Sequence, residues 1–222
     1  MSTWSCVKYW NFAWVARVLK SARVAFLFPD RAAFLAGVAL YDGNTDVYFG
    51  AIHELQLGWG EPARMAQAIR PVLCDWHKLY YRWGSLDPAA VASAIDLKME
   101  VLSSFRNRSL DTLRKSDEPR VRDLFWAFQK ATGRTNSKWS DASPVGAAKA
   151  LHLLCPQFMP LWDGEIADFY RCEHGPFGYE KFLWLMKEFG ANVRSFLPNP
   201  DDRSVLKRLD ENWAVVRRKK AG

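Results

Sequence analysis

The chain has 222 residues, of which 49% are hydrophobic, and a formal net charge of +7. Its length and apolar content are sufficient for one large core or two lobes around a cleft. The basic balance favours a polyanionic partner such as nucleic acid. The cysteines are scattered without a C-x-x-C pair, which argues against a disulfide framework or a zinc site: Cys6, Cys74, Cys155 and Cys172. We therefore expect no metal, no cofactor and a cytoplasmic location, nucleoid-associated if the protein is bacterial.

The first segment, Thr3 to Phe28, is rich in tryptophan but does not have the pattern of a membrane span. Basic residues interrupt it regularly, and no small-residue cleavage site follows an apolar run. The pattern predicts an amphipathic core helix and no membrane association. Asp30 is positioned to cap a second helix that runs to about Tyr41.

Helical spacing resumes from Asp46 to Leu57 and stops at a bend that contains Trp59. Aromatic residues then concentrate in Leu73 to Trp83, beside Lys78 and Arg82. These rings could form a stacking platform for unpaired bases. The interpretation we prefer here is a bulky interface between helices, and for Trp59 likewise packing rather than base stacking.

Further helices are predicted at Ala89 to Phe105 and Pro119 to Thr132. The longest polar loop, Gly133 to Asp141, follows them and contains Arg134 and Lys138 beside Trp139. Such residues are suited to contact a nucleic-acid backbone and to shape the edge of a pocket, although a plain solvated connector has the same composition.

The segment Pro144 to Leu154 is the least charged of the chain. Its only charged or polar side chains are those of Lys149 and His152, one helical turn apart. A helix that is apolar nearly all round is usually buried, and burial favours the neutral amine that a nucleophilic lysine requires. Asp163 begins the next helix after a short connection, which could bring its carboxylate towards Lys149. The alternatives are a surface lysine and a simple N-cap.

Two more helices are predicted, from Tyr179 to Leu197 and from Ser204 to Arg218. No segment alternates in a way that requires a strand, and no period indicates a repeat array. The expected architecture is all-α: residues 1–222 form one helical body, in one or two lobes, around a helix-hairpin-helix element at Ser143 to Arg171.

This element resembles the helix-hairpin-helix DNA glycosylases. Their hairpin has a G-[VI]-G-x-K-[TS]-A pattern followed by a V-D-x-H-[VI] segment, and the matching residues are Gly146, Lys149, Ala150, Asp163, Ile166 and Tyr170. The resemblance implies that Lys149 attacks the sugar of a flipped nucleotide. It also implies that Asp163 activates the lysine or offsets the positive charge that develops on the sugar. The expected function is excision of a damaged or modified base from double-stranded DNA, with abasic-site lyase activity through Lys149.

The other site residues are expected around these two. The candidates for lining the pocket are His152, Trp162 and Trp139, although the first two could equally be core residues. The candidates for contacting DNA are Gly146, Ser143, Lys138 and Arg134. The hairpin lacks the first glycine of the pattern, which leaves an alternative open: a non-catalytic DNA-binding module on the same scaffold. A helical protein-interaction domain is a third possibility, and an anti-phage role against modified phage bases is conceivable.

Overall fold

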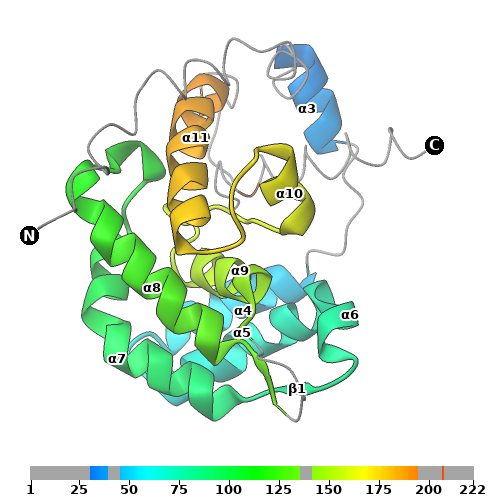
Figure 1. Cartoon of the computed structure of the whole chain (residues 1–222), viewed down its shortest axis with the longest axis vertical. Helices are drawn as coiled ribbons and strands as arrows, with labels where there is room; N and C mark the ends of the chain where they lie inside the picture. Colours follow the sequence, from blue (N-terminus) through cyan, green and yellow to red (C-terminus); the bar gives the residue numbers. More distant parts are fainter. Residues whose placement is uncertain (1–30, 40–45, 136–141, 195–206, 208–222) are drawn as a thin grey trace, which may run out of the picture. The chain divides into compact units, whose positions relative to one another are not determined.

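The computed structural model describes residues 31–39, 46–135, 142–194 and 207 (Figure 1). The chain divides into two compact units, residues 1–41 with 211–222 and residues 42–210. In the first unit the described element is helix α3 (Arg31–Ala39), which buries Phe34 and Val38 one turn apart. Most of the helices predicted for 3–28 and 204–218 lies outside the described residues.

The described part of the second unit is built mainly of helices, as expected for an all-α protein. They are α4 (Asp46–Leu57), α5 (Pro62–Trp76), α6 (Lys78–Tyr81), α7 (Pro88–Arg106), α8 (Glu118–Ala131), α9 (Pro144–Leu154), α10 (Gly164–Phe169) and α11 (Pro176–Arg194). The predicted bounds of α4 and α9 agree with the structure, and those of α7 and α8 differ by one residue at each end.

One small sheet corrects the expectation that no strand is needed. Strands β1 (Ser85–Leu86) and β2 (Arg134–Thr135) pair antiparallel, with Leu86 opposite Arg134. The two strands are two residues long, too short to show an alternating pattern. The pair joins the end of the aromatic segment after α5 to the start of the polar loop after α8.

Helix α9 packs against α8 and against α4 and α5 (Figure 1). This central position explains its composition, because Ala147, Ala148 and Ala150 are fully buried and keep the side chains at the contacts small. The expectation of a buried helix is confirmed. At the C-terminal end of α9, the Arg106 side chain of α7 donates hydrogen bonds to the carbonyls of Leu153 and Leu154, at 3.1 and 2.7 Å.

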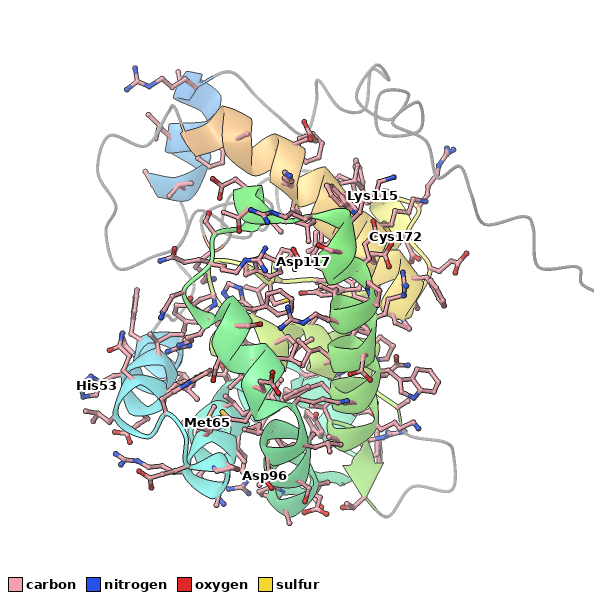
Figure 2. All side chains as sticks on the ribbon, turned by 90° about the vertical axis from the view of Figure 1, so that its left-hand side faces the viewer. His53, Met65, Asp96, Lys115, Asp117 and Cys172 are labelled. Atoms are coloured by element: carbon pink, nitrogen blue, oxygen red, sulfur yellow. The ribbon has the colours of Figure 1, made fainter. Side chains whose placement is uncertain are left out.

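The surrounding helices are amphipathic. Met65 of α5 lies inside the unit, whereas His53 of α4 and Asp96 of α7 lie at its surface (Figure 2). Trp59, in the bend between α4 and α5, has the Arg106 guanidinium 4.5 Å from its ring centroid. Packing therefore accounts for Trp59, as the sequence interpretation preferred.

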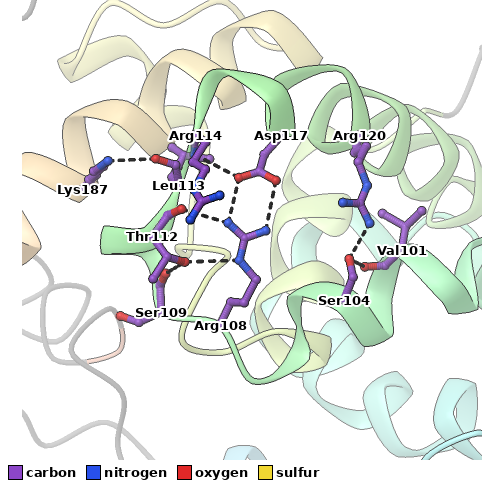
Figure 3. Close-up of polar contacts among 10 residues, drawn as sticks. All are labelled: Val101, Ser104, Arg108, Ser109, Thr112, Leu113, Arg114, Asp117, Arg120 and Lys187. Carbon is purple, nitrogen blue, oxygen red and sulfur yellow. Dashed lines mark hydrogen bonds and ion pairs between the residues drawn. The ribbon is translucent and has the colours of Figure 1, made fainter.

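The connection between α7 and α8 is held by a half-buried ion pair (Figure 3). Arg108 donates to both carboxylate oxygens of Asp117, at 3.0 and 2.7 Å, and the main-chain N–H of Arg114 adds a 2.9 Å bond. Hydrogen bonding from Arg108 lowers the pKa of Asp117 below its usual value. The side chains of Arg106 and Arg108 thus both make hydrogen bonds that stabilise the fold.

Across the described ranges, no helix combines the length and the apolar character that crossing a bilayer requires.

Candidate active site around Lys149

Lys149 lies on the least buried stripe of α9. Val145 and Lys149, one turn apart, are half-buried, whereas Gly146 to Ala148 and Ala150 to Leu154 are buried. The lysine is therefore neither a core residue nor a freely solvated one. Its stripe meets the end of α5, which determines the groups that surround its amine.

The Lys149 Nζ donates a hydrogen bond to the main-chain carbonyl of Trp76, the last residue of α5. A cation at this end of a helix is favoured by the partial negative charge of the terminal carbonyls. The bond also fixes the direction of the amine. A neutral amine that donates one N–H to the carbonyl has its lone pair directed away from that carbonyl, as a nucleophile requires.

Aromatic rings from α4 and α5 lie next to this carbonyl. Tyr48 and Trp76 are stacked, with ring centroids 5.7 Å apart and planes 7° from parallel. Tyr48 also stacks on His152, with centroids 5.8 Å apart. Tyr48 was not identified from the sequence, because it lies far along the chain from Lys149 and carries no motif. Trp76 belongs to the aromatic stretch Leu73 to Trp83, but its contact with Lys149 was not predicted.

His152 is fully buried and holds three segments together. Its Nδ1 lies 2.8 Å from the carbonyl oxygen of Met159, and its Nε2 lies 3.3 Å from the Tyr48 hydroxyl. A carbonyl only accepts, so Nδ1 donates to the Met159 carbonyl. The sequence left open whether His152 lines a pocket or belongs to the core, and these contacts favour a core residue.

His77 follows Trp76, and the neighbouring cations affect its pKa. Burial, Lys149 and Arg134, in that order of effect, lower the pKa of His77 from 6.5 to about 4. The ring is therefore neutral at physiological pH. It stacks on Tyr80 with centroids 4.5 Å apart and planes 10° from parallel.

A second lysine, Lys207, lies against the rings of Trp76 and Tyr48. Its side chain is fully buried, and Nζ lies 5.0 Å from the Trp76 ring centroid and 5.5 Å from that of Tyr48. Such contacts stabilise a desolvated ammonium through the negative face of the rings. Lys149 and Lys207 thus both contact Trp76, one through its carbonyl and the other through its ring.

Asp163 begins α10 as its N-cap. Its Oδ1 accepts a 2.8 Å hydrogen bond from the N–H of Ile166. The connection before it is anchored by Tyr179, whose hydroxyl donates to the Pro160 carbonyl at 2.8 Å. The described contacts thus link Lys149 to α5 and Asp163 to the first turn of α10.

Ser143 and Gly146 are buried at the start of α9. The Ser143 hydroxyl accepts from the N–H of Gly146 at 2.9 Å, and the Ser143 N–H donates to the Gln129 carbonyl at 2.8 Å. A Cβ on Gly146 would lie 2.7 Å from the Thr132 hydroxyl oxygen. Capping and close packing account for both residues, and their contact with DNA stays a prediction.

Four sequence candidates remain, of which the structure describes two. Arg134 is half-buried on β2, with its guanidinium 4.6 Å from the Tyr80 ring centroid. Trp162 is buried among Phe125, Tyr179 and Phe182, and its indole N–H has no hydrogen-bond partner in the part of the chain that the structure describes. Lys138 and Trp139 lie outside the described residues.

No protein-family model, curated protein or solved structure matches this chain. The described residues contain no group of three or more histidine, cysteine, aspartate or glutamate side chains placed to hold a metal ion.

Proposed function

We propose that the protein is a DNA glycosylase in which Lys149 attacks the sugar of a flipped nucleotide. The observation that carries the proposal is the position of the lysine amine, half-buried on an apolar helix and oriented by the Trp76 carbonyl. The neighbouring cation Arg134 and the net charge of +7 support a nucleic-acid substrate.

The proposed reaction uses two side chains. As the Lys149 amine bonds to C1′, the bond between C1′ and the base breaks, and the base leaves with the electron pair and takes up a proton. Asp163 accepts the proton that the amine loses, or offsets the positive charge that develops on the sugar. Opening of the sugar ring then yields a Schiff base between Lys149 and C1′, from which strand cleavage follows.

A base-release assay tests these roles. Asp163→Asn retains a side chain that caps α10 as well as aspartate does, so a fall in base release of about 100-fold or more would report chemistry and not a lost cap. Lys149→Arg retains a donor for the Trp76 carbonyl but no nucleophilic amine. Lys130→Gln, on the exposed face of α8, is the control and should leave base release unchanged.

The alternative, a binding module without chemistry, is favoured by one observation. Ser143 already occupies the N–H of Gly146, a main-chain donor with which a hairpin of this kind would hold a phosphate. DNA binding that is unaffected by Lys149→Arg and Asp163→Asn, with no base released from any duplex, would select this alternative.

A further inference from the structure

The surface formed by α6 and the turn after it exposes two large apolar side chains. Leu79 is 79% exposed and Trp83 is 71% exposed, whereas the sequence interpretation preferred a buried helix interface here. From His77 to Leu86 the only charged residues are Lys78 and Arg82, and no carboxylate is present. We propose that this surface binds the unpaired nucleotides of a single nucleic-acid strand.

Two rings of this surface, those of Tyr80 and Tyr81, are held in place before any ligand binds. Tyr80 is stacked on His77, and its hydroxyl accepts the main-chain N–H of Arg134 at 3.3 Å. The Tyr81 hydroxyl donates to the Thr132 carbonyl at 2.8 Å. These bonds, together with the β1–β2 pair, attach α6 to the end of α8, so little ordering is left to do on binding.

Cations lie beside the rings. The Arg82 guanidinium is 5.2 Å from the Trp83 ring centroid, and that of Arg134 is 4.6 Å from the Tyr80 ring centroid. Alternating aromatic and basic side chains suit a strand whose bases stack while its phosphates meet the cations. The bases of a duplex already stack on one another, so this surface selects nucleotides that are unpaired.

The other exposed aromatic residues of the described chain have acidic neighbours. Phe177 lies against Arg122, which is already paired with Glu180. Trp126, which is 51% exposed, has Lys130 over its ring but follows Asp123 by one helical turn. Trp126, whose ring like that of Trp83 has a cation over it, supplies a matched control for Trp83. This binding does not depend on the chemistry proposed for Lys149.

Fluorescence anisotropy with the full-length chain tests the proposal. Labelled single strands of about 12 nucleotides, one of DNA and one of RNA, would be titrated beside a duplex of the same sequence. We expect Trp83→Ala to weaken single-strand binding about 5- to 100-fold and Trp126→Ala to leave it within about twofold. A preference for either strand supports the proposal and identifies the source of the unpaired nucleotides.

A second measurement separates the charge from the ring. Arg82→Gln should reduce the dependence of log Kd on log salt by roughly 0.7, the value for one phosphate contact on a single strand. Equal affinity of wild type and Trp83→Ala for both single strands, or equal weakening by Trp83→Ala and Trp126→Ala, would overturn the proposal. The proposal would also be overturned if wild type bound the duplex but neither single strand.

Discussion

The amine of Lys149 and the main-chain carbonyl of Trp76 form a hydrogen bond that joins α9 to the end of α5. The bond places Lys149, which with His152 is one of the two polar side chains of α9, beside Trp76 and His77. A lysine that only stabilised the end of α5 would have the same contact. Substitutions of Lys149 must therefore separate a structural role from a chemical one.

Gly146→Ala should destabilise the protein by about 1–3 kcal/mol, because the new Cβ would lie within 2.9 Å of atoms of Thr132 and Ser143. Gly50→Ala is the matched control. A Cβ on Gly50 would meet nothing within 4 Å, and the substitution in the middle of α4 should stabilise by about 0.5–1 kcal/mol. Urea unfolding of both variants measures the difference. Equal effects of the two substitutions would argue against close packing at Gly146.

Asp117→Asn should lower the free energy of unfolding by about 2–3 kcal/mol at neutral pH, because Arg108 would lose a bidentate charged partner in a half-buried setting. Asp123→Asn, which breaks the pair with Lys98 at the surface, should cost less than about 1 kcal/mol.

The effect of Asp117→Asn also depends on pH. The pKa of Asp117 is lowered in the folded protein, so its stabilisation is complete above the unfolded value of 3.8 and is lost as the pH falls through the lower folded value. Thermal unfolding at neutral and at acidic pH should show the gap between wild type and Asp117→Asn narrowing in acid. A gap that is constant or grows in acid would contradict the assignment.

His77→Phe should flatten the pH dependence of stability between about pH 6.5 and 4. The pKa of His77 falls to about 4 in the folded protein, so in this window the unfolded chain binds a proton that the folded chain does not. Wild type therefore loses stability as the pH falls from 6.5 to 4, and the loss stops near pH 4. Phenylalanine retains an aromatic ring that can stack on Tyr80, but it has no group that titrates. Parallel stability curves for the two proteins between these pH values would refute the assignment.

Local pattern was enough to predict much of the fold. Pro144 to Leu154 has the composition of a buried helix, and Asp163 caps α10 as its alternative sequence interpretation allowed. The cap formed by Ser143 was not predicted, because the sequence interpretation assigned this residue to DNA contact. The strands at Ser85 and Arg134 could not be predicted, because a two-residue pairing leaves no periodicity.

The partners of the candidate site depend on tertiary packing. Trp76 lies 73 residues before Lys149, and Tyr48 lies 104 residues before His152. Neither pairing follows from helical spacing, which relates only residues three or four apart. The same limit applies to α6, where a run of aromatic residues looked like an interface, although Leu79 and Trp83 are exposed.

Reductive trapping tests the role of Lys149 most directly. Wild type, Lys149→Gln and Lys149→Arg would be incubated with abasic-site and modified-base duplexes in the presence of borohydride and resolved on denaturing gels, with the adduct mapped by peptide mass spectrometry. The proposed mechanism predicts a covalent adduct on Lys149 in wild type and none in either variant. An adduct that persists in Lys149→Gln, or no adduct of wild type with any duplex, would contradict it.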